Sequence, residues 1–329
     1  MNIPEIHVWD HGIIQVKISM AYPLRWVNSY VLPSSAGISI IDPGPRNRTT
    51  EEEWTKVLKH LDFGFHDVNE IFVTHHHPDH FGLAGWFQSQ ADCHVYMSQR
   101  AFDESQYMWG THSNINNQLM KWLGQHGLPE ALSVQIEQHL FGFLPQVTPI
   151  PDITTVADGS FLTMGSLSWL AIESGGHAPG HLSLFQQELG LMMCGDAVLP
   201  RISPNISLIP GSDPDPLFTF MNSLHHLNTY KVNQAFPGHR DVFINYHERL
   251  DELLNHHEER LERIEKLLHP SPQTGYEICE SLFGNRLSIH QMRFAMCEVL
   301  AHLQELVRRG HARIILSSLD YRIKYTYEE

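Results

Sequence analysis

Four side chains that can bind a metal ion occur within six residues in the first quarter of the chain. They are the imidazoles of His75, His77 and His80 and the carboxylate of Asp79. Neutral imidazole and carboxylate are ligands that zinc and similar divalent ions take in proteins. In an extended segment His75 and His77 point the same way, because side chains alternate with a period of two, so this pair predicts one shared ion. Asp79 and His80 lie further round the turn and predict a second ion.

The segments around these residues predict how they are held. The run Glu70–Val73 is short and apolar, which is typical of a buried strand, and residues 81–87 indicate the start of a helix. A helix is also predicted from Thr50, because three glutamates follow where the helix dipole favours negative charge. Strand-rich residues 5–42 precede this helix. The order strand, helix, strand predicts an α/β protein.

The spacing His-x-His-x-Asp-His after a strand resembles the metallo-β-lactamase superfamily. The resemblance implies three further ligands downstream, and each has a match in this chain. His177 lies in a Gly-Gly-His-Ala-Pro-Gly-His segment, Asp196 ends the apolar run 189–195, and His239 follows a strand predicted over 232–236. The resemblance also implies the fold, an αββα metallo-β-lactamase sandwich.

In such a protein the two metal ions share one carboxylate. The resemblance implies one ion held by His75, His77 and His177, a second held by Asp79, His80 and His239, and contact of Asp196 with both. Zinc is the expected metal, with iron and manganese as alternatives. A hydroxide bridging the two ions would attack the substrate. Asp79 would be catalytic, orienting the hydroxide and carrying a proton to the leaving group.

Two residues near the predicted ligands have supporting roles. His181, four residues after His177, is expected to be structural or to contact a ligand rather than to bind metal. Asp42 begins the turn Asp42-Pro43-Gly44-Pro45, and the superfamily has a similar turn near its metals. Asp42 either contacts a ligand or is simply a turn residue.

The chain between His80 and His177 is longer than in the simplest members of the superfamily. Residues 101–147 have mostly helical spacing of apolar residues, so we predict a helical insertion there. Insertions beside an active site commonly shape the substrate pocket. The alternative is that these apolar residues form only the core of the insertion. The residues concerned are Tyr107, Trp109, Met120, Trp122 and Phe143.

The tail differs in character from the preceding chain. We predict a catalytic domain over 1–245 and a second domain over 246–329, which starts with a long amphipathic helix at 246–268. A Pro-Ser-Pro break, helices near 274–283 and 288–309, and β-rich runs at 312–316 and 321–325 follow, a winged-helix-like pattern. Its basic residues are offset by acids, which favours packing or homodimerisation over nucleic-acid binding. From about residue 270 onward the tail holds no predicted ligand, so we expect this part to be dispensable for bond cleavage but needed for solubility or assembly.

Composition narrows the choice of partner and location. The 329 residues carry a formal net charge of −15, which argues against a polyanionic substrate. The four cysteines are widely spaced, so neither a disulfide framework nor a cysteine zinc site is predicted. No apolar run reaches the ~20 residues of a membrane span, and the start lacks a secretion signal, so a cytoplasmic protein without membrane contact is expected.

Three function classes remain open. The first is hydrolysis of an ester, thioester or lactone of a small acyl substrate, as in glyoxalase II or the acyl-homoserine lactonases, which the apolar insertion and acidic charge favour. The second is phosphodiester cleavage, as in the nucleases of the superfamily, which the tail favours and the charge disfavours. The third is a persulfide dioxygenase-like iron protein or a non-catalytic metal-binding protein. The complete ligand set argues against a non-catalytic role.

Overall fold

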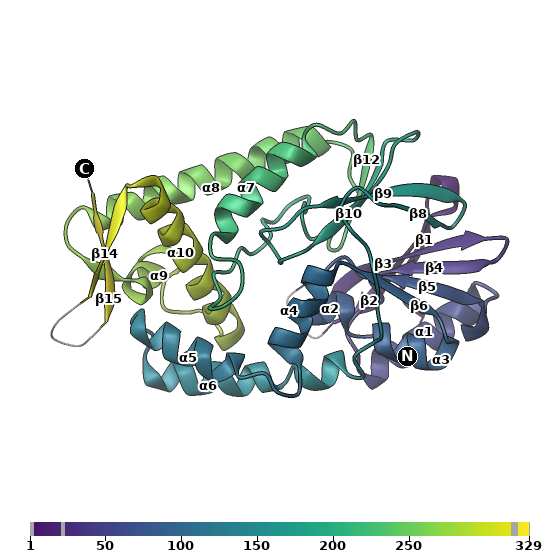
Figure 1. Ribbon diagram of the computed structural model, residues 1–329, viewed down its shortest axis with the longest axis horizontal. Helices are drawn as coiled ribbons and strands as arrows, with labels where there is room; N and C mark the ends of the chain where they lie inside the picture. Colours follow the sequence, from purple (N-terminus) through teal and green to yellow (C-terminus); the bar gives the residue numbers. More distant parts are fainter. Residues whose placement is uncertain (1–2, 21–23, 317–321, 329) are drawn as a thin grey trace.

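Two β-sheets lie face to face, with helices on their outer sides (Figure 1). The structure is a computed structural model that describes residues 3–20, 24–316 and 322–328. The first sheet has the order β1 to β7; its strands are β1 (Ile6–Val8), β2 (Ile14–Ser19), β3 (Trp26–Ser34), β4 (Gly37–Ile41), β5 (Val68–Phe72), β6 (His94–Met97) and β7 (Thr154–Thr155). Pairing is antiparallel from β1 to β4 and parallel from β4 to β7.

The second sheet has the strand order β12, β11, β10, β9, β8. Its strands are β8 (Phe161–Met164), β9 (Leu167–Glu173), β10 (Leu182–Gln186), β11 (Leu191–Gly195) and β12 (Gln234–Pro237). Only the pairing of β11 with β12 is parallel. The predicted αββα sandwich is therefore confirmed.

Strand β4 and the last two residues of β5 are buried on both faces. Ile41 and Phe72 point into the core between the sheets, where they join Trp169 and Phe236 of the second sheet. Their neighbours along the strands belong to the core on the outer side, which contains Trp54 and Phe87. These two aromatic residues come from α1 (Arg48–His60) and α3 (Ala84–Ala91), and their rings pack edge to face. Burial on both faces explains why β4 and the last residues of β5 are mostly apolar in the sequence.

The insertion is helical, as predicted. It consists of α4 (Gln99–Trp109), α5 (Ile115–Gln125), α6 (Glu130–Phe141) and the 3₁₀ turn η3 (Leu144–Val147). Short 3₁₀ turns also occur at η1 (Asp10–Gly12) and η2 (Phe65–Asp67). In Figure 1 the helices α5 and α6 extend away from the sandwich and lie under the C-terminal part of the chain.

The C-terminal part consists of helices and a small sheet. Helix α7 (Pro216–Leu227) is followed by α8 (Tyr246–Leu268), α9 (Gly275–Phe283) and α10 (Ile289–Arg309). The sheet has the order β13 (Gln273–Thr274), β15 (Ile323–Tyr327), β14 (Ala312–Leu316). The last strand lies two residues beyond the predicted run, whose first residue, Tyr321, is outside the described residues. Helix α10 packs against α6, α7, α8 and α9, so it joins the insertion to the tail.

None of the helices that the structure describes is long and apolar enough to cross a membrane.

Candidate metal centre

All seven predicted ligands meet at one end of the sandwich. His75 and His77 lie in the loop after β5, and Asp79 and His80 in α2 (Pro78–Phe81). Proline at the first position of α2 fits a helix start, because it lacks only an N–H that would have no partner there. The remaining three, His177, Asp196 and His239, follow the strands β9, β11 and β12.

Two groups of three side chains form within this cluster. In the first, Nδ1 of His77 lies 3.0 Å from Nε2 of His75 and 3.1 Å from Nε2 of His177. In the second, Oδ2 of Asp79 lies 3.1 Å from Nε2 of His239 and 3.8 Å from Nε2 of His80. Within each group the potential ligand atoms are all within 4.8 Å of one another, as a bound ion requires.

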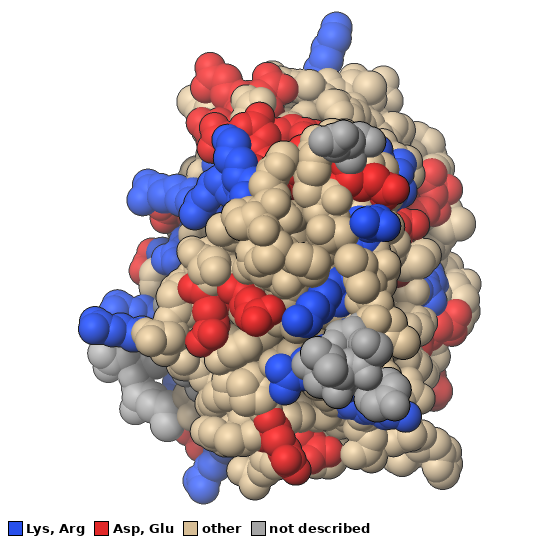
Figure 2. All heavy atoms as spheres, turned by 90° about the vertical axis from the view of Figure 1, so that its left-hand side faces the viewer, with Lys and Arg blue, Asp and Glu red and all other residues tan. Residues whose placement is uncertain are grey.

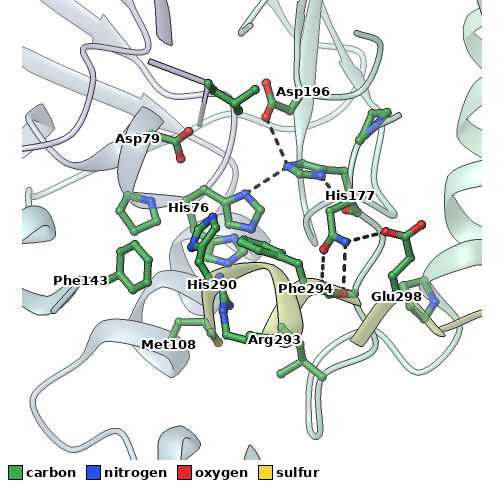
Figure 3. A pocket seen from close by; sticks show the side chains of 18 of the residues that line it. His76, Asp79, Met108, Phe143, His177, Asp196, His290, Arg293, Phe294 and Glu298 are labelled. Carbon is green, nitrogen blue, oxygen red and sulfur yellow. Dashed lines mark hydrogen bonds and ion pairs between the residues drawn. The ribbon is translucent and has the colours of Figure 1, made fainter. Parts of the chain in front are cut away.

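Asp196 contacts both groups, and Figure 3 shows its carboxylate facing His177. Its Oδ2 atom is 3.6 Å from Nε2 of His177 in the first group and 3.4 Å from Nε2 of His239 in the second. Its Oδ1 atom is 3.5 Å from Nε2 of His80. The carboxylate is thus placed to contact ions in both groups.

The cluster has the chemistry expected of a divalent metal site. Nε2 of His80 and Oδ1 of Asp196 are buried and have no hydrogen-bond partner among the described residues, which is costly for polar atoms that bind nothing. Burial and neighbouring imidazoles hold the pKa of His75 and of His77 well below the usual value. Both are therefore neutral, the form that binds metal. These observations fit divalent ions in both groups.

The second group is electrostatically different. Burial alone would lower the pKa of His239, but the carboxylates of Asp196 and Asp79 outweigh it and raise that pKa to about 10. The same two carboxylates and Asp42 raise the pKa of His80 against the effect of burial. The carboxylates that favour the protonated form of these two imidazoles would also favour a bound cation, which would neutralise their negative charge.

Contacts outside the cluster orient four of the five imidazoles. Nδ1 of His80 lies 2.8 Å from the Asp42 carboxylate, and Nδ1 of His75 lies 2.9 Å from the hydroxyl of Thr74. The other two contacts run to backbone carbonyls: His177 Nδ1 to Asn205 O at 2.8 Å, and His239 Nδ1 to Trp26 O at 3.1 Å. Such contacts fix the tautomer and the direction of the ring.

Asp42 is more than a turn residue. Besides His80, its carboxylate accepts hydrogen bonds from the backbone N–H and the hydroxyl of Thr74, both at 2.8 Å. Its φ of +52° is a left-handed conformation that Asp tolerates better than most residues. The contact with His80 decides between the two roles that the sequence left open.

His181 has the structural role expected of it. It is fully buried, its Nδ1 lies 2.8 Å from the hydroxyl of Ser174, and its Nε2 accepts a hydrogen bond from the backbone N–H of Asp196 at 3.1 Å. Burial lowers its pKa to about 3, so it remains neutral. His181 therefore holds the Asp196 backbone in place.

A cavity of about 550 Å³ opens beside Asp79 and Asp196. From the insertion, Met108, Trp109 and Phe143 line it. Figure 3 shows Met108 and Phe143 on the side of the cavity opposite Asp196. Part of the insertion therefore lines the cavity beside the cluster, as a role in a substrate pocket requires.

Three of the insertion residues that we expected in the pocket lie elsewhere. The Tyr107 hydroxyl donates to the carbonyl of Pro210, Met120 is buried in the core, and Trp122 packs against the ring of His126 at 4.6 Å between centroids. Helical spacing identified all three as apolar-facing residues, but it does not tell which of several buried surfaces a residue faces. For these three, the alternative reading as core or packing residues was correct.

The tail also lines the cavity, which the sequence did not predict. Phe283 from α9 and Phe294 from α10 contribute apolar surface, and Arg293 contributes a guanidinium 4.0 Å from the ring centroid of Phe294. The expectation that the tail serves only packing or assembly is therefore incomplete.

The sequence analysis did not single out His76. Its buried Nδ1 has no hydrogen-bond partner among the described residues, and the residue lines the same cavity. The run of three consecutive histidines was the available signal.

Comparison with known families agrees with this geometry. The family model of the metallo-beta-lactamase superfamily matches residues 24–255, and a model of the metallo-beta-lactamase-like C-terminal domain matches residues 261–322. The chain belongs to the metallo-β-lactamase superfamily. The first match covers the whole metal cluster, and the second covers the tail segments that line the cavity.

Individual members of the superfamily are similar over most of the chain. A probable metallo-hydrolase of Bacillus subtilis, YqjP, is 24% identical over 309 residues, which is 89% of this chain and 92% of that protein. The crystal structure of a metallo-beta-lactamase family protein from Thermus thermophilus has a TM-score of 0.85 at 28% identity and covers 96% of this chain and 99% of that one. An atrochrysone carboxyl ACP thioesterase of Emericella nidulans is 26% identical over 129 residues, or 39% of each chain. The superfamily and these relatives support a metallo-hydrolase.

Proposed function

We propose that this protein is a binuclear metal-dependent hydrolase that cleaves an ester, thioester or lactone of a small acyl substrate. The observation that carries the proposal is a largely apolar cavity that opens directly onto the carboxylates of Asp79 and Asp196. A cavity of this kind binds an acyl chain by burying it and leaves its carbonyl at the metal cluster. The thioesterase among the relatives supports this substrate class.

The seven side chains would hold two divalent ions, zinc in our proposal. The ions would supply a water molecule of lowered pKa and polarise the carbonyl that it attacks. His75, His77 and His177 bind one ion and Asp79, His80 and His239 the other, with Asp196 shared. Burial alone would raise the pKa of Asp79, but His80 and His239 outweigh it and lower that pKa. Asp79 is therefore ionised at neutral pH, and as a hydrogen-bond acceptor it can orient the attacking water.

The charge of the cavity wall and of the tail disfavours a phosphodiester substrate. Arg293 is the single Lys or Arg among the described residues that line the cavity. Besides the clustered carboxylates, three further acids line it: Glu104, Asp213 and Glu298. Figure 2 shows the face at the C-terminal end of the molecule. There, basic and acidic side chains are interspersed over the described residues instead of forming one basic surface. We propose that the tail, which we regard as winged-helix-like with a boundary near 245, forms a pocket wall and does not bind nucleic acid.

The first prediction is that each chain binds two metal ions. The two groups of three ligands and the shared Asp196 have enough donors for two sites. Elemental analysis of the metal-replete protein should give about two equivalents of divalent metal per chain and identify it. One equivalent or less under these conditions would contradict the binuclear site, and iron with oxygen uptake would favour the redox alternative.

The second prediction is that hydrolysis becomes more efficient as the acyl chain lengthens. Each buried methylene gains about 0.8 kcal/mol, so four fully buried methylenes would gain roughly 3 kcal/mol. Because burial is incomplete in an open cavity, we expect kcat/KM to rise about ten- to thirtyfold from acetyl to hexanoyl thioesters. A parallel assay with bis-p-nitrophenyl phosphate should show little turnover.

Two variants of the insertion separate pocket from packing. Trp109→Leu removes part of the cavity wall and should flatten the chain-length trend, whereas Trp122→Leu changes the same residue type outside the cavity and should preserve it. A flat trend in the unmodified protein, together with rapid phosphodiester cleavage, would refute the acyl-hydrolase proposal.

A further inference from the structure

We infer that Glu298 of α10 and Arg260 of α8 are positioning residues for the metal ligand His177, acting through Asn205. The tail would then support the metal site itself in addition to lining the pocket. The inference rests on the metal cluster of the proposed function, but not on the choice of substrate.

A continuous series of contacts leads from the tail to the cluster (Figure 3). Nδ1 of His177 donates to the backbone carbonyl of Asn205 at 2.8 Å. The side-chain amide of Asn205 donates in turn to Oε2 of Glu298 at 2.9 Å and to the carbonyl of Phe294 at 3.4 Å. The second oxygen of Glu298 accepts from the guanidinium of Arg260. The side chains of His177, Glu298 and Arg260 are 6%, 13% and 14% exposed, so water competes weakly for these contacts.

Asn205 lies in a loop whose conformation depends on the tail. Residues 196–215 connect β11 to α7 and contain neither helix nor strand. Helix α8 holds the start of this loop, where Arg249 donates to the carbonyl of Leu199 at 2.7 Å. Helix α10 holds the middle, where the N–H of Leu208 donates to the carbonyl of Cys297 at 3.1 Å. Glu298 makes the charged contact to the residue that faces His177.

The direction of the Asn205 carbonyl matters for metal binding. An imidazole that binds metal through Nε2 must carry its proton on Nδ1, and an acceptor at Nδ1 fixes both the tautomer and the ring orientation. For His75, His80 and His239 the equivalent acceptors belong to the sandwich itself: Thr74, Asp42 and Trp26. For His177 the acceptor belongs to a loop held by α8 and α10. The first metal site is therefore the one that the tail can influence.

Removing a carboxylate that only stabilises the helices of the tail should not change metal affinity. Glu305, two turns further along α10, is the internal comparison: it is 2% exposed, pairs with Arg308 and Arg309 of its own helix, and makes no hydrogen bond or ion pair with Asn205 or with a clustered residue among the described residues. Removing either carboxylate takes an ion-pair partner from at least one arginine, Arg260 or Arg308, and lowers stability. Only the removal of Glu298 should also change metal affinity.

The experiment measures zinc affinity on the full-length, metal-depleted protein by competition with a chromophoric chelator, without substrate. We expect Glu298→Ala to weaken one of the two bound ions about tenfold, the lower end of the range for contacts behind a ligand. Asn205→Ala should have a similar effect, and the double variant should be no weaker than either, because both act on one path. Glu305→Ala should bind both ions within about twofold of the unmodified protein.

Further variants keep the test decisive. Glu298→Gln retains an oxygen for the Asn205 amide and should recover most of the affinity. If Glu298→Ala does not fold, Glu298→Met combined with Arg260→Met removes both charges of the pair and should show the same loss of affinity. Unchanged affinity in the folded variants, or an equal loss in Glu305→Ala, would overturn the inference. Neither outcome bears on the proposed hydrolysis, because no substrate is present.

Discussion

Asp196→Asn is expected to lower kcat/KM for an acyl thioester about a thousandfold and to remove one of the two metal ions that we propose. The carboxylate lies between the two groups of ligands, within 3.6 Å of His177, His80 and His239. A neutral amide of the same shape keeps the packing but loses the charge that two cations would share. A metal ion contributes several kcal/mol of stabilisation to the attacked oxygen, and about 4 kcal/mol corresponds to a thousandfold in rate. Steady-state kinetics and elemental analysis of the purified variant measure both effects.

Asp213→Asn is the matched control. Asp213 also lines the cavity, but its carboxylate accepts a hydrogen bond from the backbone of Asp215 and makes no ion pair with a predicted ligand among the described residues. The same loss of one negative charge should therefore change kcat/KM only a few-fold. Asp196→Asn with two bound ions and near-normal turnover would show that Asp196 is not a shared ligand.

Asp42→Asn is expected to weaken binding of the ion proposed at Asp79, His80 and His239 about 10- to 100-fold, although Asp42 is not itself a proposed ligand. Its Oδ2 atom accepts from both the Thr74 hydroxyl and Nδ1 of His80. In the variant an amide N–H can face these donors, so His80 loses the acceptor that orients its ring. Losses of this size are typical of changes behind a metal ligand. Chelator competition at fixed pH gives the affinity directly.

Asp92→Asn is the control for the backbone at this position. Asp92 has the same φ of +52° but ends α3 on the surface, so the substitution makes the same chemical change in the same conformation away from the cluster. Metal binding by this variant should be unchanged. Normal affinity in Asp42→Asn would mean that His80 is held by the loop backbone alone.

The positions of the seven clustered residues could be predicted from two signals: the segment from His75 to His80 follows a strand that the sequence marks clearly, and the resemblance to the metallo-β-lactamase superfamily implies His177, Asp196 and His239. The apolar runs before His75, Asp196 and His239 are short and end in the ligand, and strand ends on one side of a sandwich converge. Sequence analysis predicted no strand at β10 (Leu182–Gln186), which directly follows the His177–His181 motif. The sequence does mark β10 by its apolar residues, and all five of its residues are buried.

The pocket was harder to predict than the cluster, for a physical reason. Trp109 and Trp122 have the same type and the same helical context, yet one lines the cavity and the other packs on His126. The difference depends on how α4, α5 and α10 are packed, which local periodicity does not encode. The Asn205 contact was also invisible, because a backbone carbonyl is present at every residue and leaves no signal in the sequence.

The contribution of α10 to the cluster has a consequence for the order in which the site is completed during synthesis. A ribosome makes the chain from its N-terminus, so all seven clustered residues, the last being His239, are made before Arg260 and Glu298. A nascent chain of about 250 residues thus has every side chain of the metal cluster but neither the support behind His177 nor the α9 and α10 side of the pocket. Metal captured at this stage would be held by a site in which His177 is not yet oriented. The final arrangement of both the cluster and the pocket follows only when the tail docks.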